Sequence, residues 1–95
     1  MLFQLGRCVQ TSGIANESGN YPVFALAVLN SLDRHKSGDW GDLCDEDKEL
    51  NNEAINSEGR IVSAYNLPTR EGNEKVYIIT EHDRSVTTVL FASEY

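Results

Sequence analysis

Two short stretches of the chain concentrate residue types that can do chemistry, and the first is HKSGDWGDL at residues 35–43. It places His35, Asp39 and Asp42 close together beside Trp40, the only tryptophan. Imidazole and carboxylate groups are the usual proton shuttles and divalent-ion ligands in proteins. This stretch could therefore hold a general base or a metal ion.

The second stretch is TEHDRS at residues 80–85, which we expect in a hairpin loop, where functional groups are often displayed. A meeting of the two loops would allow a small metal-dependent enzyme, with Arg84 stabilising a developing negative charge. The candidate catalytic residues of this alternative are His35, Asp39, Asp42, Glu81, Asp83 and Arg84.

The same residues also have an architectural interpretation, which we favour because their spacing matches no ligand motif with a mechanism attached. Gly38 and Gly41 would let the chain turn sharply on either side of Trp40, whose ring would be buried between helix and sheet. Arg84 would pair with a neighbouring acid, and a contact between Arg84 and an aspartate of the first stretch would join the two loops. On this interpretation we expect no metal site and no cofactor.

Hydrophobic periodicity predicts the elements that position these loops. Residues 3–10 alternate imperfectly and predict a short edge strand, and SGIANESGN after them predicts a loop. Two helices should follow, one from Pro22 to about His35 and a surface helix with an acidic first turn within residues 44–59. Three runs rich in β-branched and aromatic residues then predict an antiparallel meander: RIVSAYNL, KVYIIT and SVTTVLF.

This order, β-α-α-β-β-β, indicates an α+β fold in which two helices pack on an antiparallel sheet of three to four strands. In the first helix, the spacing of Leu26, Leu29 and Leu32 predicts that they face the core, and Phe24, Ala25 and Val28 widen this apolar face. The middle strand is apolar on both faces. A homodimer is one arrangement that would cover the face away from the helices, and a different protein is another.

The length of 95 residues suits one domain spanning residues 1–95. The longest apolar run, VFALAVL, is far shorter than the roughly 20 residues that cross a bilayer, so we expect no membrane partner. The N-terminal residues lack a basic leader and an apolar stretch suited to secretion, which favours a cytoplasmic location with Cys8 and Cys44 reduced.

The chain carries 15 acidic and 8 basic residues, a net charge of −7. Binding to a phosphate backbone needs a basic surface, so we expect no direct contact with nucleic acid. The charge suits docking onto a basic protein surface, including one that normally holds nucleic acid, although it also serves solubility alone. The acids that we expect at such an interface are Asp39, Asp42, Asp45, Glu46, Asp47, Glu81 and Asp83.

Five pieces of the chain together resemble a small family of plasmid-related proteins of bacterial mobile elements: HKSGDWGDL, EDKELNNEAI, GRIVSAY, YIITEHDRSVTTVLF and the terminal SEY. The resemblance covers roughly residues 33–95. Some family members are labelled as a subunit of a type I restriction system, and no reaction comes with the resemblance. The chain departs from the family pattern at His82 and in the insertion TREGNEK.

The resemblance implies a mobile-element setting, in which small acidic proteins often bind host defence machinery. We therefore expect a non-catalytic interaction protein of a plasmid or phage. Its partner would be a host or phage protein, such as a nucleic-acid-binding effector of restriction or CRISPR defence. The small metal-dependent enzyme is the alternative.

Overall fold

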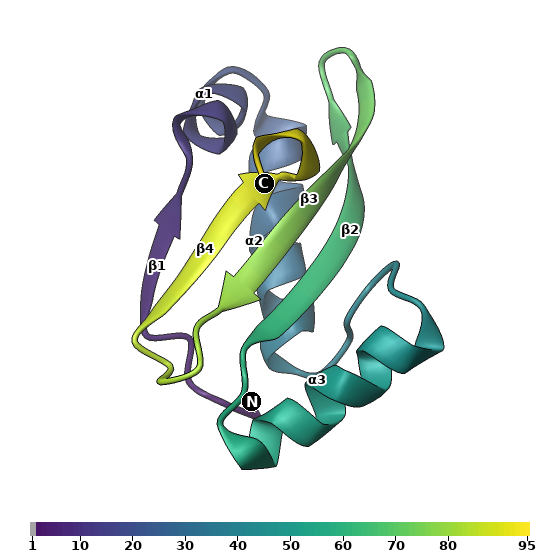
Figure 1. The fold of residues 1–95 in the computed structure, drawn as a ribbon. Helices are drawn as coiled ribbons and strands as arrows, with labels where there is room; N and C mark the ends of the chain where they lie inside the picture. Colours follow the sequence, from purple (N-terminus) through teal and green to yellow (C-terminus); the bar gives the residue numbers. More distant parts are fainter. Residues whose placement is uncertain (1) are drawn as a thin grey trace.

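A four-stranded sheet with the strand order β1-β4-β3-β2 organises the fold (Figure 1). The computed structural model describes residues 2–95. The elements along the chain are β1 (Arg7–Gln10), α1 (Ser12–Asn20), α2 (Pro22–Lys36), α3 (Asp45–Ser57), β2 (Ile61–Thr69), β3 (Gly72–Thr80), β4 (Val86–Phe91) and the short 3₁₀ turn η1 (Ala92–Glu94). The predicted α+β class is confirmed, with three helices rather than two.

The predicted meander is confirmed, since β2 pairs antiparallel with β3 and β3 pairs antiparallel with β4. β1 lies at the sheet edge, as predicted, but it runs parallel to β4, so the sheet is mixed. Hairpin turns force antiparallel pairing only between the strands that they join. Because helices separate β1 from the other strands in the chain, no such turn sets its direction.

Helix α1 lies in the stretch SGIANESGN, so the prediction of a loop there is wrong. The helix begins after Thr11, whose hydroxyl accepts a hydrogen bond from the backbone N–H of Ile14 at 3.3 Å. Ile14 is fully buried in the core beside α2. An N-cap and one buried side chain thus outweigh the poor helix propensity of the glycine and asparagine residues.

Helix α2 begins at Pro22, as predicted, but the predicted core face of this helix is only partly right: Phe24 and Val28 are buried, and the leucines at its centre are not. The buried residues of α2 are Phe24, Val28, Ser31 and His35. Leu26 and Leu29 point to solvent and are 67% and 61% exposed. Two polar residues that find hydrogen-bond partners inside the protein therefore occupy the core face.

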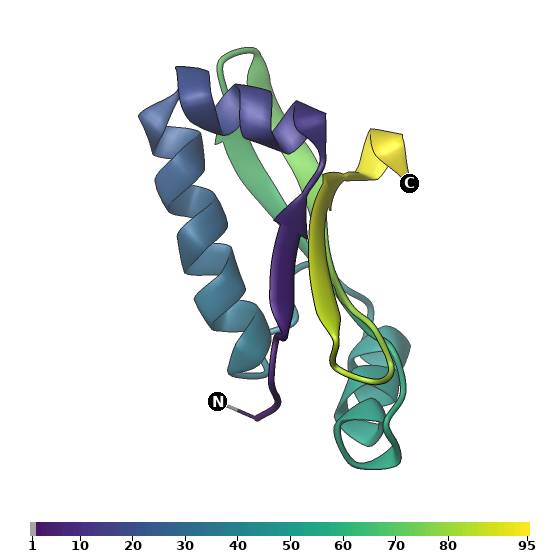
Figure 2. The ribbon, with the colours of Figure 1, turned by 90° about the vertical axis from the view of Figure 1, so that its left-hand side faces the viewer.

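The sheet separates two layers (Figure 2). Helix α2 packs on one face and forms the main core with three strands, while η1 lies on the other side of the sheet. This core contains Ile14, Phe24, Val28, Tyr65, Leu67, Val76, Ile78 and Val89. A second cluster of Phe3, Trp40, Ala54 and Ile61 lies where α3 meets the N-terminal segment.

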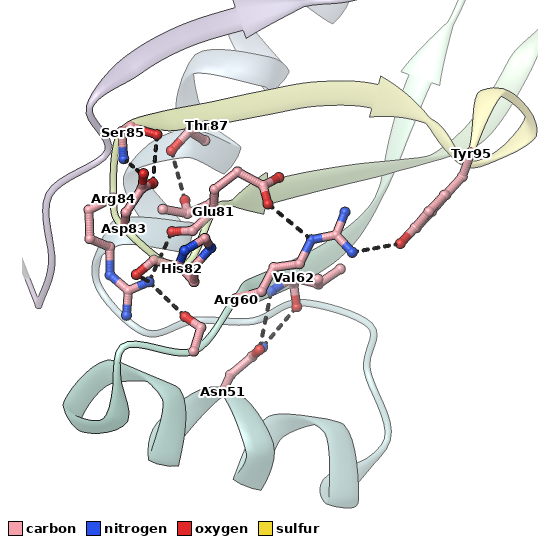
Figure 3. Close-up of polar contacts among 12 residues, drawn as sticks. Asn51, Arg60, Val62, Glu81, His82, Asp83, Arg84, Ser85, Thr87 and Tyr95 are labelled. Carbon is pink, nitrogen blue, oxygen red and sulfur yellow. Dashed lines mark hydrogen bonds and ion pairs between the residues drawn. The ribbon is translucent and has the colours of Figure 1, made fainter.

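The chain itself covers part of the sheet face for which the sequence predicts a partner. The Tyr95 ring packs edge-on against the Tyr77 ring, with 5.6 Å between ring centroids. Arg60 donates a hydrogen bond to the Tyr95 hydroxyl and pairs with the Glu81 carboxylate, as Figure 3 shows. Ile79, on the same face, is only 3% exposed.

The free edge of β2 is also covered. The side-chain amide of Asn51 donates to the Val62 carbonyl at 2.8 Å and accepts from the Val62 N–H, in the way that a neighbouring strand would (Figure 3). Two residues further on, the N–H and the carbonyl of Ala64 bond the backbone at Trp40 and Asp42. Asn51, placed in mid-helix without a propensity reason, thus closes a sheet edge that would otherwise be open to pairing.

Candidate functional site

His35 lies in the core and not on the surface of a loop. It is fully buried on the last turns of α2 and contacts the Phe3 and Trp40 rings edge-on. Its Nδ1 forms a short hydrogen bond with the Ser63 hydroxyl, and its Nε2 lies 2.9 Å from the Thr80 hydroxyl. The sequence gives no signal for these contacts, because the three residues meet only through tertiary structure.

The hydrogen bonds around His35 fix where each proton lies. The Thr87 hydroxyl bonds the Leu5 carbonyl at 2.7 Å, and because a carbonyl can only accept, Thr87 uses its single proton there. The Thr80 hydroxyl, 2.7 Å from Thr87, must then donate to it and accept from Nε2 of His35. Nε2 therefore carries the imidazole proton, and Nδ1 accepts from the Ser63 hydroxyl.

This arrangement keeps His35 neutral. Burial lowers its pKa from 6.5 to about 4, because the interior disfavours the charged imidazolium. Both ring nitrogens have partners, and Ser63 and Thr80 are themselves fully buried. A substrate cannot reach this pair of serine and histidine, so the cluster holds α2 onto the sheet.

The carboxylate of Asp39, beside Trp40, forms an ion pair with Arg34. Arg34 Nε donates to the Asp39 carboxylate at 2.7 Å and Nη2 donates to its other oxygen at 3.2 Å. The hydrogen bonds from Arg34 lower the pKa of Asp39. Asp42 is exposed at the other end of the loop.

Trp40 is buried, as predicted, and its indole N–H donates to the Asn52 side chain at 3.0 Å. Gly41 lies against β2 with a φ of +74°, and a Cβ built there would approach the Ala64 carbonyl oxygen to 2.0 Å. No other residue fits at position 41. The backbone of this loop therefore packs directly against the backbone of β2 at the sheet edge.

Arg84 contacts backbone carbonyls rather than the acids that the sequence suggests. Its Nη2 donates to the Ala54 carbonyl at 2.7 Å, and its Nη1 donates to the Gly59 carbonyl at 2.6 Å. Nη1 also bonds the carbonyls of its own loop, at Glu81 and His82 (Figure 3). A cation at the C-terminal end of a helix also meets the negative end of the helix dipole. Arg84 thus fastens α3 to the β3-β4 hairpin.

The remaining groups of the second loop bond locally. Asp83 accepts from the Ser85 hydroxyl and backbone N–H, and these hydrogen bonds lower the Asp83 pKa. Glu81 pairs with Arg60 at 3.6 Å, and His82 is exposed. Among residues 2–95, the buried hydrogen bond between His35 and Thr80 is the only hydrogen bond or ion pair that joins residues 80–85 to residues 35–43.

The structure therefore does not bring the alternative catalytic set together. Across the described part of the chain, no three His, Cys, Asp or Glu side chains gather in a way that could hold a metal ion. Of the acids predicted at an interface, Asp39, Glu81 and Asp83 are engaged within the molecule.

The acids at the start of α3 are exposed, and the structure extends this group along the helix. Asp45, Glu46 and Asp47 form its first turn. Glu49 and Glu53, also exposed, continue it and are missing from the predicted interface. Helical spacing is the signal that finds them, since Glu46, Glu49 and Glu53 follow i, i+3, i+7 opposite buried Asn51 and Ala54. We call Glu46, Glu49 and Glu53 the acidic stripe.

Comparison with known proteins adds no assignment: no family model, no curated protein and no solved structure matches the chain. Within residues 2–95, the helices are too short and too polar to cross a membrane.

Proposed function

We propose that the protein is a non-catalytic interaction protein of a bacterial mobile element that binds a basic, nucleic-acid-binding surface of a host or phage protein. An effector of restriction or CRISPR defence is the target class that we favour. The mobile-element setting comes from the resemblance of residues 33–95, and the mode of binding comes from the charge of α3.

The acidic stripe is the observation that carries this proposal. Like charges at i, i+3 and i, i+4 destabilise a helix by about 0.2–0.5 kcal/mol per pair. No basic side chain pairs with the stripe among the described residues, where the four ion pairs involve other acids. A chain that keeps this repulsion on its surface is suited to a partner that supplies the cations.

Helix α3 presents the stripe rigidly. Asn51 fixes the buried side of the helix to β2, Asn52 accepts from the Trp40 indole, and Arg84 holds its C-terminal end. Leu50, 62% exposed, lies among the acids and offers an apolar contact at the centre of the interface. The two loops that look catalytic in the sequence thus support an interaction helix.

The test uses a charge-matched pair of variants. Glu49→Gln/Glu53→Gln and Glu71→Gln/Glu74→Gln each change the net charge from −7 to −5, and all four residues are exposed. The first pair lies on α3, and the second lies in the β2-β3 hairpin. If the position of the acids on α3 decides binding, and not the total charge, only the α3 variant should lose activity.

The assay is transformation of bacteria by an unmodified plasmid that is subject to type I restriction or to a CRISPR effector. Expression of the protein should raise the frequency of transformation. The α3 variant should lose this effect and the hairpin variant should keep it. With the purified effector, competition with DNA should weaken as salt screens the charges. No protection against either defence class, or equal loss in both variants, contradicts the proposal.

A further inference from the structure

The two edges of the sheet differ in whether their outward-facing backbone groups have hydrogen-bond partners. The β2 edge is closed by Asn51 and by residues 40–42, and Pro68 further along has no N–H to offer. On the β1 edge, Arg7 donates to the Ser85 carbonyl just before β4, and Thr11 donates to the Val89 carbonyl in β4. The alternation of a strand therefore turns the backbone of Cys8 and Gln10 away from the sheet. Within residues 2–95, no side chain or other segment bonds these outward groups.

A groove of about 390 Å³ runs beside this open edge. Its walls come from β1 and α2, with Cys8 and Gln10 on one side and Leu29 and Leu32 on the other. Leu26, next to Leu29 on the outer side of α2, continues the apolar surface to solvent. We call Leu26, Leu29, Leu32 and the β1 edge the open face.

The lack of acidic side chains on the open face indicates which partner binds there. Residues 22–32 contain no charged side chain, in a chain of which 24% is charged. A second copy carries the same net charge of −7, so repulsion is least where both copies present a surface without acidic side chains, as residues 7–10 and 22–32 do. A basic partner would gain nothing from this face and would bind the acids of α3 instead.

We propose that the open face forms a two-fold homodimer, in which the β1 edges of two copies pair antiparallel and join their sheets. Pairing about Val9 would place Cys8 of each copy opposite Gln10 of the other, which matches all the outward donors with acceptors. A stable interface buries about 800 Å² of each partner. Four strand residues do not supply this area, so the leucines of α2 must pack across the two-fold axis as well. The inference concerns a different surface from the proposed function and does not rest on it.

The test compares two leucines of equal exposure by sedimentation equilibrium of the full chain. Leu29 and Leu50 are 61% and 62% exposed, but only Leu29 belongs to the open face. The wild type should reach twice the chain mass of 10.6 kDa. Leu29→Glu should raise the dimer dissociation constant by at least about tenfold, and Leu50→Glu should leave it unchanged, because a central interface residue dominates binding. Circular dichroism checks that both variants fold.

Thiol cross-linking tests the pairing itself. Cys8 and Cys44 are both free and exposed, so the variants Cys44→Ser and Cys8→Ser each keep one reporter. In the proposed pairing the Cα atoms of the two Cys8 residues lie within about 10 Å, as strand geometry dictates. An ethylene-bridged bis-maleimide should therefore join two chains of Cys44→Ser and not of Cys8→Ser. A monomer at all concentrations up to about 1 mM, where binding is worth about 4 kcal/mol, overturns the inference. A dimer that Leu50→Glu dissolves, or that cross-links only through Cys44, also overturns it.

Discussion

The guanidinium group of Arg84 and the backbone carbonyl of Ala54, thirty residues apart in the chain, are joined by a 2.7 Å hydrogen bond. The same side chain reaches Gly59 beyond the end of α3, while its own backbone is held at a φ of +61°. One residue therefore couples the acidic helix to the β3-β4 hairpin and carries backbone strain while doing so.

Replacement of Arg84 should separate these two effects. Arg84→Ala should lower the free energy of unfolding by about 2–4 kcal/mol, because its charge-assisted hydrogen bonds to the Ala54 and Gly59 carbonyls are lost. Arg84→Gly should be more stable than Arg84→Ala by about 1 kcal/mol, since glycine adopts a positive φ without strain. Urea unfolding measures both. An Arg84→Lys variant as stable as the wild type would show that charge suffices and that the forked contact is unimportant.

The buried His35 predicts a pH dependence of stability. Its pKa is about 4 in the folded protein and 6.5 as a free side chain, so between these values the unfolded chain binds the extra proton. The free energy of unfolding should be highest above about pH 6.5, fall as the pH drops toward 4 and level off below pH 4. The total loss that His35 causes should be about 3 kcal/mol.

Comparison of the two histidines isolates this contribution. Urea midpoints at pH 7 and pH 4.5 should differ less in His35→Gln than in the wild type, although His35→Gln is less stable at pH 7. His82→Gln should keep the full wild-type difference, because His82 is exposed. Carboxylates titrate in the same range in all three proteins and cancel in the comparison. Equal pH slopes in all three would show that His35 does not supply the effect.

The directions assigned to the hydrogen bonds of His35, Thr80 and Thr87 can be tested by replacing Thr80. Thr80→Val keeps the side-chain shape but removes the acceptor of the Nε2 proton and the donor to Thr87. Leaving such buried groups unpaired costs about 1–3 kcal/mol. The matched change Thr88→Val, at a half-buried position one residue after Thr87, should cost less than about 0.5 kcal/mol. Thermal unfolding of the two variants measures the difference, and equal melting temperatures would contradict the network.

Three glycine-to-alanine changes should rank in a fixed order. Gly41→Ala should cost at least about 3 kcal/mol, because it combines a positive φ with a Cβ that collides with the Ala64 carbonyl. Gly72→Ala should cost about 1 kcal/mol, since its φ of +114° is strained but its surroundings are open. Gly19→Ala, in α1 with open space and no positive φ, should stabilise by about 0.5–1 kcal/mol. A different order in calorimetry would contradict the placement of the loop against β2.

The sequence is sufficient to predict the meander and the start of α2. Period-two runs such as the one around Val76 are unambiguous, and a proline at a helix start has one favoured place. The buried Trp40 also follows from the sequence, because it lies between two glycines that let the chain turn.

The errors come from polar residues that tertiary contacts draw inward. Leu26 and Leu29 outweigh Ser31 and His35 in any hydrophobic pattern, yet the two polar residues face the core. His35 bonds Ser63 and Thr80 there, and the Ser31 hydroxyl donates to the Ala27 carbonyl of its own helix. Helix α1 depends on a single cap at Thr11, and the role of Arg84 depends on carbonyls that only the folded chain brings near. Spacing along the sequence carries no information about such partners.

The hydrogen bonds of His35 also decide the strand register. Val76, Ile78 and Thr80 share one face of β3, so a shift of the strand by two residues would leave the apolar alternation almost intact. That shift would put Ile78 or His82 opposite the imidazole and leave its Nε2 proton without the hydroxyl of Thr80. The apolar alternation alone tolerates that shift, whereas the hydrogen bonds of His35 do not.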